Sequence, residues 1–444
     1  MMKKITIFTL LALALVLAGC GGGSNPATSA VNGGPTNATL TTGDAVNPAI
    51  LKFELTVSAV TLTGTSPTPT TGNLLSKPAE VEFVHEAGTF EPLALINIPP
   101  GTYSGATLTV GNPEVVVVNG TTPTSVPATL SSSTITVNFS PAITVTSTSN
   151  SQINFDLDLA ASVTLNGSPT ITSATIAPVF NVTTTTVNAN GNEDDNSGEI
   201  EDVHGSVTNI TAPNFTIQTK EATIVFATDS NTKFKDGITQ LSDLKVGDIV
   251  EVDGTTKSDG TKLATKVERE GSSSGDEAEG VISAVTGSPA TSITIVHQVS
   301  SSATSATTVD ITINSSTVFS VRADKLNVSA PAFDATHIGK GQRIEADAAT
   351  AGTPLVATKL KLREQGIVGV VAASPAPTNS SFTLNIDPAS AFGKLSGATT
   401  VAVTIPNGGN VKTPPTAGAT LLVRGLVFVN GTTYTLIGTR EDHN

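Results

Sequence analysis

The chain has 444 residues, of which 38% are hydrophobic and only 14% charged, and its formal net charge at pH 7 is −14. This length is enough for several domains of about 100–150 residues each. A negative field repels phosphate backbones and the sequence has no basic stripe, so nucleic acid is excluded as an expected partner. Threonine and valine favour strands, the 39 glycines and 25 prolines favour turns, and no helical apolar repeat follows residue 30. The composition therefore predicts an all-β protein.

The first 20 residues, MMKKITIFTLLALALVLAGC, have the form of a secretory signal. Lys3 and Lys4 precede an apolar segment that is shorter than the about 20 residues of a membrane span. The end of this stretch, Leu-Ala-Gly-Cys at 17–20, resembles the lipobox of bacterial lipoproteins. The resemblance implies a signal peptide at 1–19 and a Cys20 that carries acyl chains such as palmitate. The alternative is an ordinary secretory signal with an unmodified cysteine.

Two further features favour a lipid anchor on Cys20. It is the only cysteine in the chain, so it cannot form an internal disulfide. Residues 20–48 are rich in small and polar residues with almost nothing to bury, and we expect a flexible tether there. Position 21 is glycine rather than aspartate, which in the sorting logic of Gram-negative lipoproteins favours the outer membrane. The expected location is therefore the bacterial cell envelope, on the cell surface or the periplasmic face.

Residues 49–187 contain about seven short segments that alternate apolar and polar residues between glycine and proline turns, which predicts a β-sandwich. One segment, INIPPGTYSGATLTV, resembles part of an uncharacterised N-terminal domain of bacterial lipoproteins, domain of unknown function 4382. The resemblance covers residues 50–185 and implies a transthyretin-like sandwich. We expect Tyr103, in the Pro-Gly-x-Tyr turn, to form a structural corner through its hydroxyl.

Residues 188–202 read NANGNEDDNSGEIED, which invites comparison with a calcium-binding loop. An EF-hand loop requires glycine at its sixth position and a helix on each side. Counted from Asn192, the sixth residue is Ser197, and no helix is expected on either side. We therefore interpret 188–200 as an acidic linker, with calcium binding as the alternative.

The rest of the chain repeats one pattern of short strands at 201–271, 277–364 and 365–444. Glycines correspond between the copies, as do the residues around them: Gly205 with Gly280 and Gly369, and Gly247 with Gly341 and Gly418. The stretch KVGDIVEVDG at 245–254, followed by a strand with Ala-x-x-Val, resembles a bacterial repeat family, domain of unknown function 5666. The resemblance implies small OB-like barrels, and glycines at the bends of short alternating strands agree with it. The predicted fold is an N-terminal β-sandwich followed by three small β-barrel repeats.

Six carboxylates in and after KVGDIVEVDG pose a choice between a metal or acid–base site and a polar strand surface: Asp248, Glu251, Asp253, Asp259, Glu268 and Glu270. The neighbouring positions of Val250 and Val252 stay apolar in all three copies, so they are expected to face a barrel interior. Glu251, in contrast, becomes Glu345 and then Leu422. Because the acidic set is not kept within one chain, we predict solvent-facing strand and turn positions rather than a site.

No catalytic, cofactor-binding or metal-binding residue is predicted. The five histidines have no metal-ligand spacing, and the sequence lacks a cysteine pair, a Gly-x-Ser-x-Gly elbow and a phosphate-binding loop; the histidines are His85, His204, His297, His337 and His443. The nearest approach to an acid–base pair is His85-Glu86, interpreted as a solvated strand end. We therefore expect that the protein is not an enzyme.

These features favour a non-catalytic, lipid-anchored envelope protein, with the sandwich and barrels strung as a surface rod that acts in scaffolding or adhesion. Its expected partners are the membrane, through Cys20, and a glycan or protein of the envelope. The alternative is a lipoprotein that binds a ligand or glycan in a barrel cleft or at the sandwich–barrel junction. The absence of tryptophan weakens a sugar-stacking site.

Overall fold

The computed structural model describes residues 38–45, 47–75, 77–84, 91–96, 98–146, 151–186, 198–219, 223–257, 259–272, 276–299, 307–321, 328–406, 410–411 and 415–443. The predicted signal peptide at 1–19, Cys20, the pair His85-Glu86 and most of the acidic stretch 188–202 lie outside these residues. Among the described residues, no helix has the length and apolar character needed to cross a membrane.

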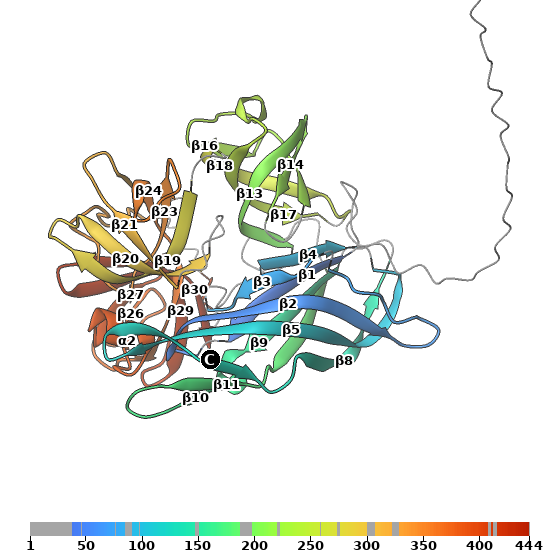
Figure 1. The fold of residues 1–444 in the computed structure, drawn as a ribbon, viewed down its shortest axis with the longest axis horizontal. Coiled ribbons are helices and arrows are strands. Elements are labelled where there is room, and N and C mark those ends of the chain that lie inside the picture. Colours follow the sequence, from blue (N-terminus) through green and yellow to red (C-terminus); the bar gives the residue numbers. More distant parts are fainter. Residues whose placement is uncertain are drawn as a thin grey trace, which may run out of the picture.

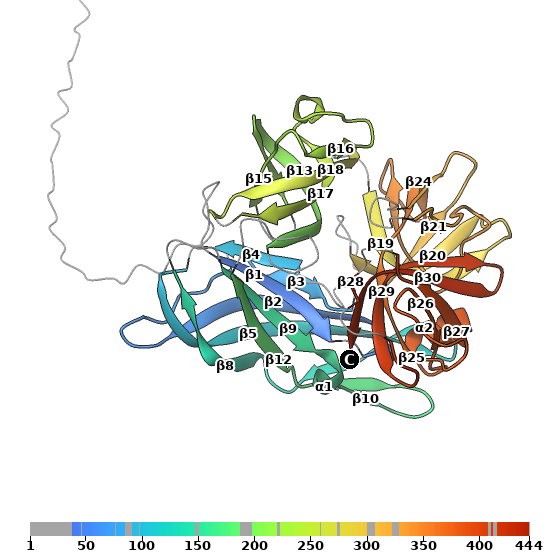
Figure 2. The ribbon, with the colours of Figure 1, turned by 180° about the vertical axis from the view of Figure 1, so that it is seen from behind.

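The protein is all-β, as predicted, with 60% of it in strands and 4% in helix. Figure 1 shows an N-terminal sandwich, drawn in blue to teal, beside three barrels that follow it in green, yellow to orange and red. The view from behind in Figure 2 shows the same four units. The first, second and third barrels begin at Glu199, Asp276 and Gln365, and each is one sheet.

Three sheets and one short helix form the sandwich. One sheet has the order β12-β9-β1-β4, another β3-β2-β5-β6 with β8 also paired to β5, and the third β10-β11-β7. Their bounds are β1 Ala38–Ala45, β2 Ile50–Gly64, β3 Ala79–Glu82, β4 Glu91–Ile96, β5 Gly101–Asn119, β6 Thr122–Val126, β7 Ala128–Leu130, β8 Thr134–Val145, β9 Ser151–Asp158, α1 Leu159–Ser162, β10 Val163–Asn166, β11 Ser173–Ile176 and β12 Phe180–Thr186.

One apolar core joins the three sheets, with Phe53, Phe83 and Phe155 fully buried in it. Tyr103 is also fully buried, and its hydroxyl donates a hydrogen bond to the backbone oxygen of Pro99 at 2.7 Å. The predicted tyrosine corner is therefore confirmed. The hydroxyl finds a backbone acceptor four residues upstream, which fixes the turn that feeds β5.

The prediction of a flexible tether at 20–48 is wrong for its last third, which contains the strand β1. β1 pairs in parallel with β9 and antiparallel with β4, so both of its edges are hydrogen bonded. Leu40 is fully buried in the sandwich core. This strand is held by tertiary pairing and one apolar anchor, and neither is visible in the composition of residues 38–45.

Each barrel is a ring of five strands with a sixth strand attached. In the first barrel the order is β15-β14-β13-β17-β18-β16, and parallel pairing of β15 with β18 closes the ring. The second and third barrels close through β21 with β24 and β27 with β30.

The strands and short helices of the barrels have the following bounds. They are β13 Glu199–Thr211, β14 Asn214–Gln218, β15 Thr223–Ala227, β16 Lys233–Lys235, η1 Leu241–Asp243, β17 Asp248–Thr256, β18 Lys262–Ser272, β19 Asp276–Thr286, β20 Ser292–Val299, β21 Thr308–Thr312, β22 Val318–Val321, β23 Arg343–Ala348, β24 Leu355–Leu362, β25 Gln365–Val371, β26 Ser381–Asn385, α2 Ala391–Ser396, β27 Thr400–Thr404, β28 Asn410–Val411, β29 Thr420–Asn430 and β30 Thr433–His443.

The three barrels share individual hydrogen bonds as well as strand order. Gly247, Gly341 and Gly418 all have a positive φ, between 86° and 96°, in the turn before β17, β23 and β29. In each barrel the N–H of this glycine donates to a carbonyl of the first strand, at 2.8, 2.8 and 2.9 Å. Glycine is required there because other residues adopt a positive φ only at a cost. The structure also supplies a sixth strand in the third copy, β28, which occupies the place of β16 and β22.

The four units are packed against one another, so the predicted rod is wrong. A cluster of seven buried apolar residues joins the sandwich to the second and third barrels: Leu51, Val116, Val118, Val281, Val296, Ala391 and Leu395. The core of the second barrel also includes Leu426, Phe428 and Ile437 of the third barrel. Apolar burial therefore makes one body of the sandwich and the last two barrels. The first barrel has an apolar core of its own.

Candidate functional site

The first and second barrels meet through charged side chains on the outward faces of their central strands. Alternate residues of a strand point to opposite faces. Val250 and Val252 are buried in the core of the first barrel, as predicted, so Glu251 between them points outward. Across the sheet, Glu251 pairs in register with His204 of β13 and Glu268 of β18.

The second barrel presents an equivalent row of side chains. Glu345 of β23, which corresponds to Glu251, is in register with Glu279 of β19 and Lys361 of β24. The next row contains Glu277 and Asp347 in register. We call these two facing rows and their ionic partners the charged interface; it consists of His204, Glu251, Asp253, Lys266, Glu268, Glu270, Glu277, Glu279, Arg343, Glu345, Asp347, Lys359, Lys361 and Arg363.

Lys361 is the central cation of the charged interface. Its Nζ lies 3.0 Å from Glu345, 3.1 Å from Glu268 and 3.5 Å from Glu251, and it also contacts Glu270. Only 3% of its side chain is exposed. Carboxylates of both barrels therefore share one buried ammonium group.

Three other cations extend these ion pairs. Arg363 lies 2.7 Å from Glu251 of the first barrel and 3.1 Å from Glu345 of its own barrel. Lys359 bonds Glu268 across the interface at 2.9 Å, and Lys266 bonds Glu251 at 2.6 Å within the first barrel. Buried pairs of this kind tolerate the loss of water only when their partners are well placed.

Burial and neighbouring charges shift several pKa values in the charged interface. Burial opposes ionisation of Glu345 and Glu268, but Lys361 and the adjacent cations outweigh it and lower the pKa of each carboxyl to about 2. For Asp347, burial and the nearby Glu345 raise the pKa to about 8. Both carboxylate oxygens of Asp347 lack a hydrogen-bond partner among the described residues.

His204 lies where the two barrels meet. Its Nδ1 is 2.8 Å from Glu270 and 3.4 Å from Glu277. Burial acts to lower the pKa of the imidazole, but these two carboxylates outweigh it and hold the pKa well above its usual value. Burial and Glu345 likewise raise the pKa of Glu270. We infer that His204 is charged near neutral pH and bridges one carboxylate of each barrel.

Four groups of the charged interface could be considered as cation ligands: His204, Glu251, Glu270 and Glu345, whose ligand atoms lie within 4.8 Å of one another. The Lys361 ammonium contacts three of the four. A cation of the chain itself therefore already occupies the space between these carboxylates, and we assign no metal site to them.

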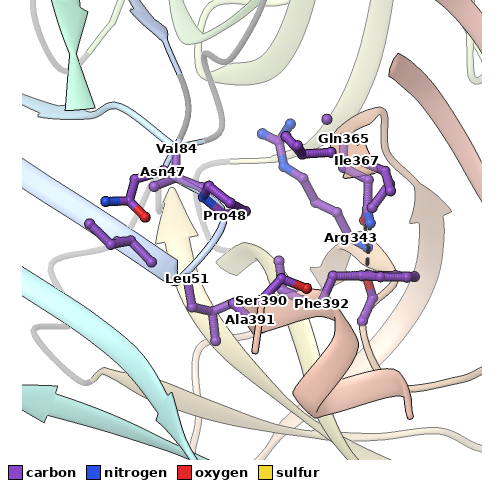
Figure 3. A pocket seen from close by; sticks show the side chains of 15 residues that line it. Asn47, Pro48, Leu51, Val84, Arg343, Gln365, Ile367, Ser390, Ala391 and Phe392 are labelled. Carbon is purple, nitrogen blue, oxygen red and sulfur yellow. Dashed lines mark hydrogen bonds between the residues drawn. The ribbon is translucent and has the colours of Figure 1, made fainter. Parts of the chain in front are cut away.

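A pocket of about 90 Å³ lies at the junction of the sandwich with the second and third barrels (Figure 3). Pro48, Ile367 and Phe392 give it apolar walls, and the Arg343 side chain lines it as well. The guanidinium of Arg343 pairs with Glu279 at 2.6 Å and donates to the backbone oxygen of Glu364 at 2.8 Å. Arg343 thus belongs to both the pocket and the charged interface.

The prediction that the acidic residues of KVGDIVEVDG face solvent is wrong. Glu251 is fully buried, and Asp248, Asp253 and Glu268 are each 8% exposed. Only Asp259, in the turn before β18, is exposed as expected. The strand faces were identified correctly, but the outward face is covered by another barrel.

Inspection of the sequence missed His204, Lys361 and Arg363. The alignment of the copies contains a signal for Lys361 and Arg363. Lys266, Glu268 and Glu270 of β18 correspond to Lys359 and Lys361 of β24 and to Arg363, which directly follows β24. At two alternate positions the first copy has glutamates and the second copy has basic residues, which indicates that the two strand faces are complementary in charge. His337 instead pairs locally with Asp334 at 2.8 Å.

The fold and the charged interface define an all-β protein built from a sandwich and tandem small barrels. Residues 204–268, most of the first barrel, match a family model described as Domain of unknown function (DUF5666). No curated protein matches the chain.

Two solved structures show weak similarity. One is Unr CSD456 from Drosophila, at 12% identity over 55% of this chain and 97% of that chain, with a TM-score of 0.13. The other is a multidomain protein with nucleic acid binding domains from Streptococcus pneumoniae, at 11% identity over 53% and 72%, with a TM-score of 0.12. Scores this low carry no argument about fold or function.

Proposed function

We propose that the protein is a non-catalytic, lipid-anchored scaffold or adhesion module of the bacterial cell envelope. The observation that carries this proposal is the state of the titratable groups between the first two barrels. They are buried and joined in ion pairs between units, where an acid–base catalyst would need access to substrate. Their arrangement suits rigid attachment of one barrel to another.

The anchor is proposed from the sequence around Cys20. A stretch of 17 residues separates Cys20 from β1, and such a stretch spans at most about 60 Å when extended. Acyl chains on Cys20 would hold the sandwich within that distance of the bilayer, and two or more chains give stable attachment. The tyrosine corner at Tyr103 supports the further proposal that residues 50–185 are a lipoprotein domain of the 4382 type.

The anchor is tested by expressing the full chain and the Cys20→Ala variant in a Gram-negative host and separating membranes from soluble fractions. We expect the parent chain in the membrane fraction, with palmitate incorporated, and the variant in the soluble fraction. A Ser24→Ala variant, which leaves the cysteine in place, should behave like the parent. Membrane retention of Cys20→Ala without palmitate would refute the lipid anchor.

A second candidate function, ligand binding at the sandwich–barrel junction, is favoured by the pocket. Its apolar walls and single buried guanidinium suit a small molecule that carries both an apolar part and an anionic or hydroxyl group. A thermal-shift screen of short-chain carboxylates and monosaccharides tests it, because a ligand that binds only the native state raises the melting temperature.

The pocket is distinguished from nonspecific binding by two valine variants. Val84→Phe should narrow the pocket and abolish the shift, whereas Val328→Phe, at an exposed position away from the pocket, should preserve it. If no compound raises the melting temperature, the scaffold function is favoured over ligand binding. A shift that survives Val84→Phe would place the ligand elsewhere.

A further inference from the structure

The first barrel is attached to the rest of the molecule by a different kind of contact from the one that joins the other units. The sandwich and the second and third barrels share apolar clusters. The apolar core of the first barrel contains residues of that barrel alone among the described residues. Its contact with the second barrel is the charged interface, and a backbone N–H at Gly198 reaches the sandwich at Gln152.

The charged interface carries more acid than base. Eight carboxylates face five lysine and arginine side chains and one histidine; the carboxylates are Asp253, Glu251, Glu268, Glu270, Glu277, Glu279, Glu345 and Asp347, and the cations are Lys266, Arg343, Lys359, Lys361, Arg363 and His204. Even with His204 charged, the described carboxylates of the charged interface outnumber its cations by two. Charge balance in a buried site therefore favours bound protons.

Asp347 is placed to hold one of these protons. It is 6% exposed, and neither of its oxygens has a hydrogen-bond partner among the described residues. Glu277 of β19 lies beside it in register, and Glu345 precedes it on the same face of β23. Among the described residues, the cations that act on it most strongly are Lys361 and Lys359 of β24.

Both of these lysines bond carboxylates of the first barrel, and Lys361 also lies 3.0 Å from Glu345 of its own barrel. Lys359 binds Glu268 and Asp236, and Lys361 binds Glu251, Glu268 and Glu270. An ionised Asp347 must therefore draw a lysine away from the first barrel or be reached by water. Either change weakens the contact between the two barrels.

We propose that the first barrel is a pH-releasable module, which docks on the second barrel while Asp347 is protonated and separates as the pH rises and Asp347 ionises. The sandwich and the other two barrels remain one body because apolar clusters join them. His204 and Glu270 act in the same direction, since both favour the protonated form in the docked state.

The size of the effect follows from linkage. Asp347 has a pKa of about 8 in the docked state and 3.8 for an ordinary aspartate. Between these values each pH unit lowers the docking constant by up to about tenfold for one proton. Asp347 alone therefore favours docking most below about pH 4 and least above pH 8. The ion pairs of Glu345 and Glu268 are fully formed above their ordinary pKa of 4.5, so docking is tightest near pH 4–5.

Distance measurements between spin labels on the full chain test the proposal. Cys20→Ser removes the single native thiol, and cysteines at exposed turn positions, Ser230→Cys and Ser315→Cys, label the first and second barrels. We expect one narrow distance at pH 5 and a longer, broad distribution at pH 9. A reference pair, Ser315→Cys with Thr432→Cys in the third barrel, should give the same narrow distance at both pH values.

Two variants identify the group responsible. Asp347→Asn should keep the first barrel docked at pH 9, or shift its release to higher pH. Asp310→Asn, at an exposed carboxylate of β21, should behave like the parent. An unchanged distance at pH 9 in the parent chain would overturn the proposal whether or not the variants fold. Equal release in Asp347→Asn and the parent would overturn the role of Asp347.

Discussion

Replacing Lys361 with methionine removes the cation that the carboxylates of two barrels share. Lys361→Met keeps much of the apolar stem but leaves Glu251, Glu268, Glu270 and Glu345 without their common partner. Breaking a buried pair by removing one partner costs about 3–5 kcal/mol, because the remaining charge is buried without compensation. With the side chain 3% exposed, solvent screening reduces this cost little, so we expect a loss in that range.

Urea unfolding at pH 7, followed by hydrogen exchange of the strands in each barrel, measures the loss. The chain has several units, so one transition midpoint would not describe it. We expect β17, β18, β23 and β24 to lose protection, while the sandwich strands keep theirs. The double variant Lys361→Met with Glu270→Gln should recover part of the loss, since coupled neighbours depart from additivity by about 0.5–3 kcal/mol.

Lys233→Met is the matched control, because Lys233 is exposed on β16. A surface change of this kind is expected to stay within about 0.5 kcal/mol. If Lys361→Met costs no more than this control, the charged interface contributes nothing to stability and the reasoning fails.

Three further predictions concern pH, the tyrosine corner and a repeat glycine. Ionised Glu345 and Glu268 stabilise the fold fully above their ordinary pKa of 4.5, and this contribution is lost as the pH falls through about 2. Protonated Asp347 stabilises the fold fully below its ordinary pKa of 3.8, and its contribution is lost as the pH rises through about 8. Calorimetry should therefore find the highest melting temperature near pH 4–5, and a maximum near pH 8 would contradict the assignment. Tyr103→Phe should cost about 0.5–1.5 kcal/mol in urea unfolding of the sandwich through loss of the hydroxyl bond to Pro99, with no change expected if that bond is absent. Gly280→Ala should cost about 1–3 kcal/mol, because a Cβ would collide with the carbonyl oxygen of Val296; Gly352→Ala, where the nearest atom is 3.5 Å away, should cost far less.

Much of the fold could be predicted because it depends on local pattern. Alternation around Val250 and Val252 identified the core face of β17, and the corresponding glycines at 247, 341 and 418 were expected at bends, where the structure shows a positive φ. Tyr103 was predictable for the same reason, since its partner lies four residues away.

The rest depends on contacts between distant segments. β1 is a strand because β9 and β4 lie on its two sides, about 110 and 50 residues away along the chain. The burial of Glu251 depends on Arg363 and Lys361, 112 and 110 residues away. The alternation of apolar and polar residues along β17 shows that Glu251 points out of its barrel, but it does not show what packs against that outer face.

The inverted charges on β18 and β24 also affect how separate molecules meet. Two first-barrel faces would both present Glu268 and Glu270, and two second-barrel faces would both present Lys361 and Arg363. Like charges facing each other across such a contact repel, so each face is a poor partner for itself. The third barrel has Leu422 where the others have Glu251 and Glu345, so it has no acidic residue at this position to offer either face. Molecules built from similar barrels would in this way avoid pairing with one another at high concentration, and each joint would stay within a single chain.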